Sequence, residues 1–247
     1  MGTSQSFKLK TTPNWSSAKK AMTEVTTEAT PESIKKFLIA FSNAVSDTVY
    51  RGKRNETGKQ SGRGRGKSYS FGKAGSRIAQ NFLGLVSGIK DLGVVDFLGL
   101  SPDELQELTA QKLLYQLYDK LAEKDDANPD DEAAKAALDE LLAEVFNECE
   151  EIEDFNGIIQ NANQDMIDGW LISYNVSYII EYNAELFQTH IFSKEANPER
   201  VFGEIKRFLK NEVSIYLGEE MHNINIFSLE GRQFVDEMTG KILDIWQ

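Results

Sequence analysis

The chain has 247 residues and carries 27 Lys and Arg residues against 39 Asp and Glu residues, a formal net charge of −12 at pH 7. Its single cysteine, Cys149, excludes a disulfide bond within the chain and fits a reducing cytosol. Since no apolar run reaches the ~18 residues of a membrane span, and no apolar signal peptide opens the chain, we expect a cytosolic protein.

The charge is divided unevenly along the sequence. Residues 1–90 hold 16 basic and 5 acidic residues, whereas residues 91–247 hold 11 basic and 34 acidic ones. Such asymmetry is typical of a basic interaction segment attached to an acidic body. The alternative is that the basic part lies on the acidic part of its own or a sister chain.

The first thirty residues are predicted to form a flexible tail. They are rich in Ser and Thr, and their few large apolar side chains, Phe7, Leu9 and Trp15, cannot offset the entropy of ordering the segment. Removal of Met1 would leave the unhindered α-amine of Gly2, whose reference pKa near 7.7–8.0 makes it partly neutral and nucleophilic at pH 7. The alternative is a frayed terminus without a function.

Most of the remaining chain is predicted to be helical. Proline at the first helical position, directly after a capping residue, marks a helix start. Four such pairs are present: Thr30-Pro31, Ser101-Pro102, Asn128-Pro129 and Asn197-Pro198. Apolar residues at helical spacing then predict helices at about 31–50, 74–90, 102–123, 130–151, 158–192, 198–217 and 229–246.

The segment 158–192 is apolar on every side, which is typical of a central helix buried by its neighbours. Residues 93–100 are interpreted as a buried connector and residues 222–227 as a short extended piece. We therefore expect an all-α protein: an irregular multi-helix bundle over residues 31–247, after a flexible tail of residues 1–30. A candidate sub-boundary lies near residues 151–157.

Residues 51–73 are predicted to form a flexible basic loop, because their glycines disfavour a helix. This loop holds eight basic residues and one acid, Glu56. Cations interleaved with glycine and aromatic residues suit single-stranded nucleic acid, through phosphate contacts and base stacking. Docking on an acidic protein surface and simple solvation are the alternatives. The candidate nucleic-acid-binding residues are Arg51, Lys53, Arg54, Arg63, Arg65 and Lys67.

No catalytic or metal-binding motif stands out. Gly66-Lys67-Ser68 resembles the end of a phosphate-binding loop, but the first glycine of that motif is replaced by Ser61 and no strand precedes it. His190, His222 and Cys149 are too scattered for a metal site or a nucleophilic pair. We expect neither a catalytic site nor a bound cofactor or metal, while an enzyme with an unrecognised carboxylate site is a further alternative.

Several stretches in a fixed order resemble the QatB family, a component of the bacterial Qat anti-phage defence system. They are the start Met1-Gly2-Thr3-Ser4, then Pro13 and Trp15, a glycine-rich middle, Gly99-Leu100-Ser101, and the Asp131–Leu138 helix. The resemblance covers roughly residues 1–150. None of these motifs is specific alone, and their order carries the resemblance.

The resemblance implies a non-enzymatic protein that is the partner and substrate of QatC, an enzyme similar to the QueC deazaguanine synthases. Such an enzyme activates the carboxylate of a 7-deazaguanine with ATP and would pass it to Gly2, forming an amide. An ATPase and a TatD-like nuclease are the further partners that it implies. The lack of a long apolar run separately predicts that the protein has no membrane partner. The tail residues that would meet the enzyme are Gly2, Thr3, Ser4, Gln5, Ser6 and Trp15.

Overall fold

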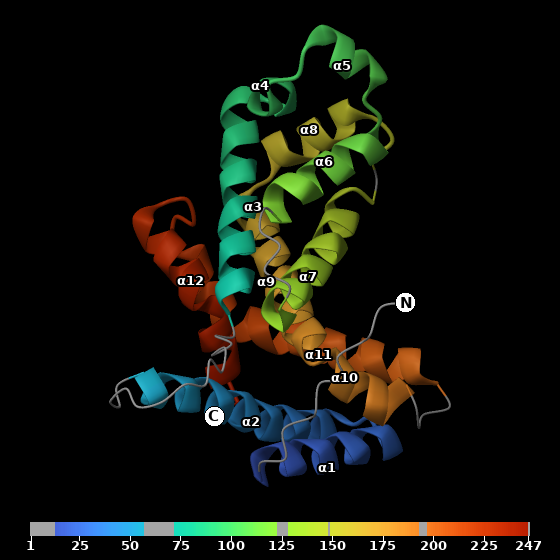
Figure 1. Cartoon of the computed structure of the whole chain (residues 1–247), viewed down its shortest axis with the longest axis vertical. Coiled ribbons are helices and arrows are strands. Elements are labelled where there is room, and N and C mark those ends of the chain that lie inside the picture. Colours follow the sequence, from blue (N-terminus) through green and yellow to red (C-terminus); the bar gives the residue numbers. More distant parts are fainter. Residues whose placement is uncertain (1–12, 57–71, 123–127, 148, 193–196, 247) are drawn as a thin grey trace, which may run out of the picture. The chain divides into compact units, whose positions relative to one another are not determined.

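The structure, a computed structural model, describes residues 13–56, 72–122, 128–147, 149–192 and 197–246. Within these residues all regular structure is helical and no β-strand occurs, which confirms the all-α prediction (Figure 1). The helices are α1 (Pro13–Thr27), α2 (Pro31–Glu56), α3 (Lys73–Leu92), α4 (Val94–Leu98), α5 (Pro102–Glu107), α6 (Ala110–Ala122), α7 (Pro129–Val145), α8 (Ile152–Asn161), α9 (Gln164–Tyr182), α10 (Ala184–Phe187), the π-helix η1 (Gln188–Phe192), α11 (Pro198–His222) and α12 (Leu229–Asp244).

The chain separates into two compact units. The first contains α1, α2, residues 185–205 and the last two residues of the chain. The second contains residues 67–184 and 206–245, and therefore α3 to α9, most of α11 and α12. Since α11 begins in the first unit and ends in the second, one helix belongs to both.

The first unit is built on a helical hairpin, in which α1 packs along α2 and also meets η1. Its core is aromatic. The ring of Trp15 meets the ring of Phe41 edge-on at 6.2 Å between centroids, and Phe187 meets Phe37 and Phe202 in the same way at 5.9 and 5.5 Å. Because α1 lies in this hairpin, the prediction of a flexible tail is wrong for residues 13–27.

The second unit surrounds α9, which packs against α7, α3 and α12. Every residue of α9 from Trp170 to Ile180 is buried, so the prediction of a central helix in this region is confirmed for α9. Trp170 meets Phe82 of α3 edge-on at 6.0 Å between ring centroids. The remainder of the predicted 158–192 helix is divided among α8, α10 and η1.

The proline signals located four helix starts correctly, at Pro31, Pro102, Pro129 and Pro198. At Ser101 the capping box is complete, because Ser101 N–H donates to Glu104 Oε2 at 2.9 Å and Glu104 N–H donates to Ser101 Oγ at 3.3 Å. These helix starts follow from local chemistry, which is why they can be read from sequence.

Helix ends differ more from the predictions. The expected helix 102–123 is interrupted at Leu108, whose backbone is extended, and Thr109 starts α6 by accepting the N–H of Lys112 at 3.3 Å. The expected helix 130–151 ends at Val145, and α8 returns so that Phe155 stacks on Phe146 at 4.4 Å between ring centroids. The expected extended piece 222–227 is wrong, because these residues form the end of α11 and a turn.

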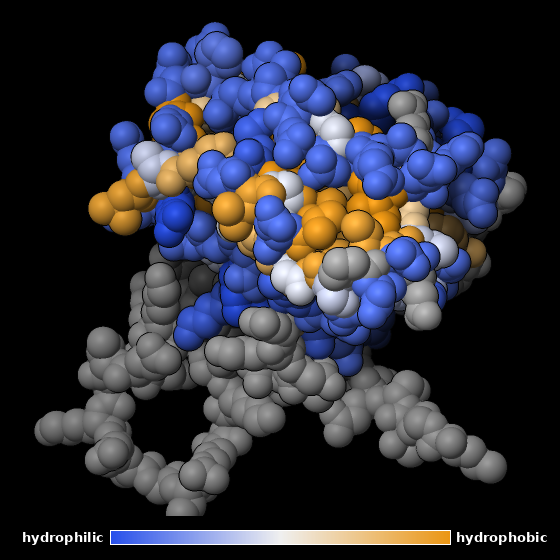
Figure 2. Space-filling view, turned by 90° about the horizontal axis from the view of Figure 1, so that it is seen from above, coloured by the Kyte–Doolittle hydropathy of each residue, from blue (hydrophilic) through white to orange (hydrophobic). Residues whose placement is uncertain are grey.

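Seen from above, the molecule shows an apolar patch among hydrophilic side chains (Figure 2). At the turn between α3 and α5 the apolar residues Val95, Phe97, Leu98 and Leu100 are only half-buried, although Phe97 also covers Gly88 of α3. None of the helices in the described residues is both long and apolar enough to span a membrane.

Candidate functional site

Of the six tail residues predicted to contact the enzyme, the structure describes Trp15. Trp15 lies in α1 and is 8% exposed. Its indole packs inside the α1–α2 hairpin, so the prediction that Trp15 belongs to a flexible tail is wrong. Gly2, Thr3, Ser4, Gln5 and Ser6 lie outside the described residues.

The predicted basic loop is divided by the structure. Arg51, Lys53 and Arg54 belong to α2, which continues to Glu56, so the prediction of a loop is wrong for residues 51–56. The other candidates, Arg63, Arg65 and Lys67, lie outside the described residues. The described chain resumes at Gly72, directly before α3.

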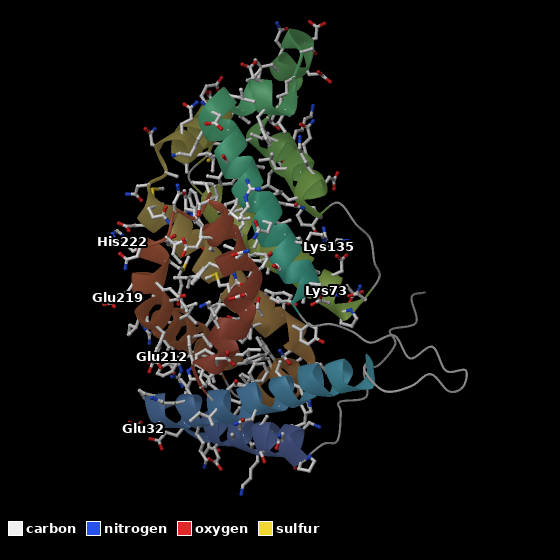
Figure 3. All side chains as sticks on the ribbon, turned by 90° about the vertical axis from the view of Figure 1, so that its left-hand side faces the viewer. Glu32, Lys73, Lys135, Glu212, Glu219 and His222 are labelled. Carbon is white, nitrogen blue, oxygen red and sulfur yellow. The ribbon has the colours of Figure 1, made fainter. Side chains whose placement is uncertain are left out.

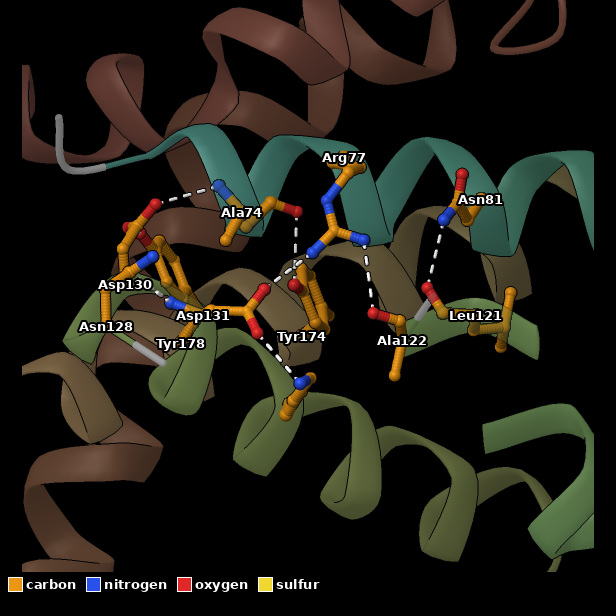
Figure 4. Close-up of polar contacts among 12 residues, drawn as sticks. Ala74, Arg77, Asn81, Leu121, Ala122, Asn128, Asp130, Asp131, Tyr174 and Tyr178 are labelled. Atoms are coloured by element: carbon orange, nitrogen blue, oxygen red, sulfur yellow. Dashed lines mark hydrogen bonds and ion pairs between the residues drawn. The ribbon is translucent and has the colours of Figure 1, made fainter. Parts of the chain in front are cut away.

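Gly72 is held by a buried carboxylate from α7. Asp130 Oδ1 accepts the N–H of Gly72 at 3.1 Å and also the hydroxyl of Tyr178, while Asp130 Oδ2 accepts the N–H of Ala74 at 2.8 Å (Figure 4). Gly72 has φ +100°, a conformation that glycine adopts at no steric cost, and its N–H lies 2.9 Å from the Tyr178 hydroxyl. We call Gly72, Ala74, Asp130 and Tyr178 the Asp130 anchor.

Local sequence places Asp130 in this position. Asn128 Oδ1 accepts the N–H of Asp131 at 3.0 Å and Pro129 occupies the first helical position, so α7 starts with both aspartates in its first turn. Asp130 is 5% exposed and Asp131 is 3% exposed. These two carboxylates of the acidic helix α7 are therefore buried and do not lie on a solvated face.

Asp131 is compensated by two cations. Its carboxylate contacts Arg77 Nη2 of α3 at 2.7 Å and Lys135 Nζ at 2.8 Å, one turn along α7. The same guanidinium donates to the carbonyl of Ala122 at 3.3 Å, at the end of α6 (Figure 4). Arg77 therefore joins the ends of α6 and α7 to α3, and the buried charge of Asp131 is paired.

Two stacked tyrosines of α9 complete the cluster. The Tyr174 hydroxyl donates to the carbonyl of Gly75 at 3.1 Å, and the rings of Tyr174 and Tyr178 lie 6.4 Å apart between centroids. Burial, and then the nearby charge of Asp130, raise the pKa of both tyrosines well above the ordinary value. Both hydroxyls therefore stay protonated and act as hydrogen-bond donors.

The contacts of this cluster stabilise the arrangement of α3, α7 and α9, and they leave few polar groups free to bind a ligand. The first N–H groups of a helix can bind an anion, but at α3 the Asp130 carboxylate already takes that place. The anchor therefore connects the end of the basic segment to the core of the second unit. A phosphate at this helix end would have to displace a buried carboxylate.

Within the described residues, no group of three or more His, Cys, Asp or Glu side chains could hold a metal ion. Cys149 Sγ contacts the carbonyl of Val145 at 3.7 Å. His222 Nδ1 lies 3.3 Å from Asp165 Oδ1, with both side chains well exposed, and Glu219 lies near His222 towards the end of α11 (Figure 3).

Two surface hollows are considered among the described residues of the second unit. One has a volume of about 460 Å³ and lies between α9 and α11, where Asp165, Asp168, Glu219 and His222 contribute to its lining. Burial raises the pKa of Asp168, while a hydrogen bond from Gln164 opposes this shift. The other hollow, of about 280 Å³, lies among α7, α9 and α11.

The sequence contained a signal for the Asp130 anchor that was not used. Asn128-Pro129 marks a helix start, and two adjacent aspartates follow it. Where the starts of two helices meet, an aspartate in the first turn of one helix can accept the free N–H groups at the start of the other. The partners of Asp130 are remote in sequence, and Tyr178 is 48 residues away. Helical periodicity alone cannot indicate such a contact.

Comparison with known proteins identified a matching family. A family model described as Qat anti-phage system associated protein QatB matches residues 64–246. This range includes both Asp130 and the hollow among α7, α9 and α11, whereas our resemblance rested on roughly residues 1–150. No curated protein and no solved structure matches the chain.

Proposed function

Because the chain belongs to the QatB family of Qat anti-phage system associated proteins, we propose that it is a non-enzymatic defence protein of the cytosol that is conjugated through Gly2. In this proposal a QueC-like enzyme binds the helical body and attaches a 7-deazaguanine to the α-amine that removal of Met1 exposes. The family match supports the defence role, and the start of the sequence supports the choice of Gly2. An ATPase and a TatD-like nuclease of the same system are the further proposed partners.

The position of α1 limits the length of the proposed acceptor segment. With Trp15 buried in α1, the tail that we propose for recognition is shortened to the residues before Pro13. Eleven residues run from Gly2 to Thr12, and they can span at most about 40 Å at ~3.6 Å per residue. A body docked within that distance of the enzyme's active site raises the effective concentration of the amine.

The proposed chemistry is the formation of an amide. At pH 7 roughly a tenth to a sixth of an α-amine with a pKa near 7.7–8.0 is neutral and nucleophilic. The Gly2 nitrogen attacks the ATP-activated carboxyl carbon of the deazaguanine, the activating group leaves with the bonding electrons, and the nitrogen loses a proton. Glycine is suited to this step because no side chain hinders the amine.

Mass spectrometry of the N-terminal peptide tests the proposal. The chain would be produced alone and together with the neighbouring QueC-like enzyme. We expect a gain in mass the size of a deazaguanine, confined to Gly2 and seen only with the enzyme present. An unmodified terminus in both samples would contradict the proposal.

Variants at Gly2 separate amine chemistry from tail recognition. Gly2→Pro presents a hindered secondary amine and should abolish the adduct, whereas Gly2→Ala keeps a primary amine and should retain part of it. Lys8→Arg and Lys10→Arg remove the nearest alternative amines and should leave the adduct unchanged. An adduct that persists in Gly2→Pro would show that Gly2 is not the acceptor.

A second candidate function is binding of nucleic acid through residues 51–73, favoured by their eight basic residues against one acid. Replacing Arg54, Arg63, Arg65 and Lys67 by Gln should weaken binding to single-stranded nucleic acid. It should also flatten the salt dependence, because each lost phosphate contact lowers the slope by roughly 0.7. Unchanged binding by this variant would exclude the basic segment as the interface.

A further inference from the structure

Three helices of the second unit each point two polar side chains at the same region, spaced four residues apart and therefore on one helix face. We call these six residues the polar ladder: Glu140 and Glu144 of α7, Ser173 and Ser177 of α9, and Lys206 and Lys210 of α11. Each helix contributes one residue to an upper rung (Glu140, Ser177, Lys206) and one to a lower rung (Glu144, Ser173, Lys210).

The upper rung is fully connected. Glu140 Oε2 accepts the hydroxyl of Ser177 and the ammonium group of Lys206, each at 2.5 Å. Glu140 also acts on Glu181, one turn beyond Ser177. Burial and then the charge of Glu140 raise the pKa of Glu181, and Lys206 opposes this shift. In this rung the carboxylate therefore accepts hydrogen bonds from both the hydroxyl and the cation.

The lower rung has the same three groups, but its hydroxyl is not hydrogen-bonded to the other two. Ser173 Oγ is fully buried and has no hydrogen-bond partner among the described residues. Lys210 Nζ lies 3.5 Å from Glu144 Oε1, against 2.5 Å for the corresponding pair in the upper rung. Among the described residues, Ser173 Oγ is one of two buried side-chain polar atoms without a hydrogen-bond partner, and Trp246 Nε1 is the other. A buried hydroxyl without a partner costs free energy.

The hollow of about 280 Å³ lies at this place. All six residues of the polar ladder line it, together with the apolar side chains of Leu141, Ala143 and Val176. Its volume is just below the range of about 300–1,000 Å³ that is typical of small-molecule sites, which suits a very small ligand. Its lining combines apolar surface with a few convergent polar groups, as such sites do. Ser173, which is 8% exposed, is one of its lining residues.

We propose that the lower rung binds a small zwitterion of the chemical class of a free amino acid. The ligand carboxylate accepts from Ser173 Oγ and Lys210 Nζ, and the ligand ammonium group donates to Glu144. The bound ligand thereby connects the lower rung as Glu140, Ser177 and Lys206 connect the upper one. This proposal does not depend on conjugation at Gly2.

The charge of the lining favours a zwitterion over a simple anion or cation. Two lysines and two glutamates give the ladder no net charge, so an ion of either sign would remain uncompensated. Lys210 and Glu144 are 43% and 47% exposed at the side chain, and an exposed pair of this kind contributes only about 0–1 kcal/mol. Separating the two to receive opposite groups of one ligand therefore costs little.

Titration of the full-length, ¹⁵N-labelled protein with L-alanine, L-serine and L-glutamine, followed by NMR, tests this site. We expect saturable shifts of the backbone amides around Glu144, Ser173 and Lys210 with at least one amino acid. Acetate and methylammonium, which each carry half of the zwitterion, should produce no saturable shift. Absence of saturation with all three amino acids, or equal saturation by acetate alone, would overturn the proposal.

Three variants locate the binding. Ser173→Ala should weaken the affinity roughly tenfold, because a hydrogen bond to a charged group is lost. Lys210→Met should abolish saturable binding, while Ser87→Ala, a matched change on α3, should leave it unchanged. Folding is checked from the dispersion of the same spectra, and unchanged affinity in folded Ser173→Ala and Lys210→Met proteins would place the binding elsewhere.

Discussion

Helix α9 presents two polar faces that differ in how completely their groups are paired. On one face Tyr174 and Tyr178 donate to Gly75 and Asp130, and the buried carboxylate of Asp130 accepts three donors. On the other face Ser177 is paired with Glu140, but Ser173, four residues earlier, has no partner among the described residues. We call the face with Tyr174 and Tyr178 the closed face, because both hydroxyls are paired. The face with Ser173 and Ser177 is the open face, because the hydroxyl of Ser173 is not paired among the described residues.

This difference separates structural from functional polarity. A buried network in which each member has a partner mainly determines which helices meet, as Asp130 does for α3, α7 and α9. A buried hydroxyl left unpaired beside a hollow lowers stability, and a ligand that supplies the missing partner can recover that free energy. Removing a paired group from α9 should therefore lower stability, whereas removing the unpaired hydroxyl should raise it.

The largest effect is expected from breaking the closed face. Asp130→Ala leaves the N–H groups of Gly72 and Ala74 and the hydroxyl of Tyr178 without their acceptor, and should lower the free energy of unfolding by about 3–5 kcal/mol. Urea denaturation measures this change. Asp139→Ala, an exposed position on the same helix, should stay within about 0.5 kcal/mol, and equal losses in the two variants would contradict the role given to Asp130.

High pH should weaken the same face without a mutation. Burial and then the charge of Asp130 raise the pKa of Tyr182 to about 12, above the ordinary 10. Below pH 10 Tyr182 is neutral in both the folded and unfolded states. As pH rises from 10 towards 12 the unfolded state loses the proton first, so stability should fall by about 2 kcal/mol.

Denaturation curves at a series of alkaline pH values measure this loss. Tyr182→Phe should make the decline shallower, whereas Tyr115→Phe, at a ring that is 60% exposed, should not change it. A decline of the same steepness in all three proteins would assign the alkaline sensitivity to other groups.

A smaller effect is expected from added volume at the closed face. A Cβ on Gly75 would lie 2.7 Å from Cε1 of the Tyr178 ring, too close for a carbon–carbon contact. Gly75→Ala should therefore cost about 2 kcal/mol, since a packed ring must shift. Gly169→Ala, on α9 with open space around its added Cβ, should instead stabilise the fold by about 0.5–1 kcal/mol. Thermal unfolding of the two variants gives the comparison.

The smallest effects should have opposite signs on the two rungs. Ser177→Ala removes a paired hydroxyl and should cost about 1 kcal/mol, whereas Ser173→Ala removes an unpaired one and should raise stability by about 1 kcal/mol. Denaturant midpoints of the two single variants in the absence of amino acids measure this difference. A loss of stability in Ser173→Ala would mean that its hydroxyl has a partner in solution.

Features set by short-range chemistry could be predicted from the sequence. Pro31, Pro102, Pro129 and Pro198 start helices because a preceding cap and a fixed φ suffice. The central position of α9 could also be predicted, since a helix that is apolar all round must be covered by its neighbours.

Features that depend on a remote partner could not be predicted. Residues 13–27 have a composition that favours a tail, and they form a helix because α2 covers Trp15, Met22 and Val25. The burial of Asp130 depends on Gly72, 58 residues away. The polar ladder joins three helices and required their register, which the sequence does not state.

The indole of Trp15 gives the first unit an optical label. The chain has three tryptophans, of which Trp15 and Trp246 belong to the first unit and Trp170 to the second. A Trp170→Phe protein emits tryptophan fluorescence from the first unit alone, and a protein lacking the other two emits from the second alone. Binding of a partner to one unit, or its unfolding, can therefore be followed by the wavelength of its tryptophan emission, without a contribution from the other unit.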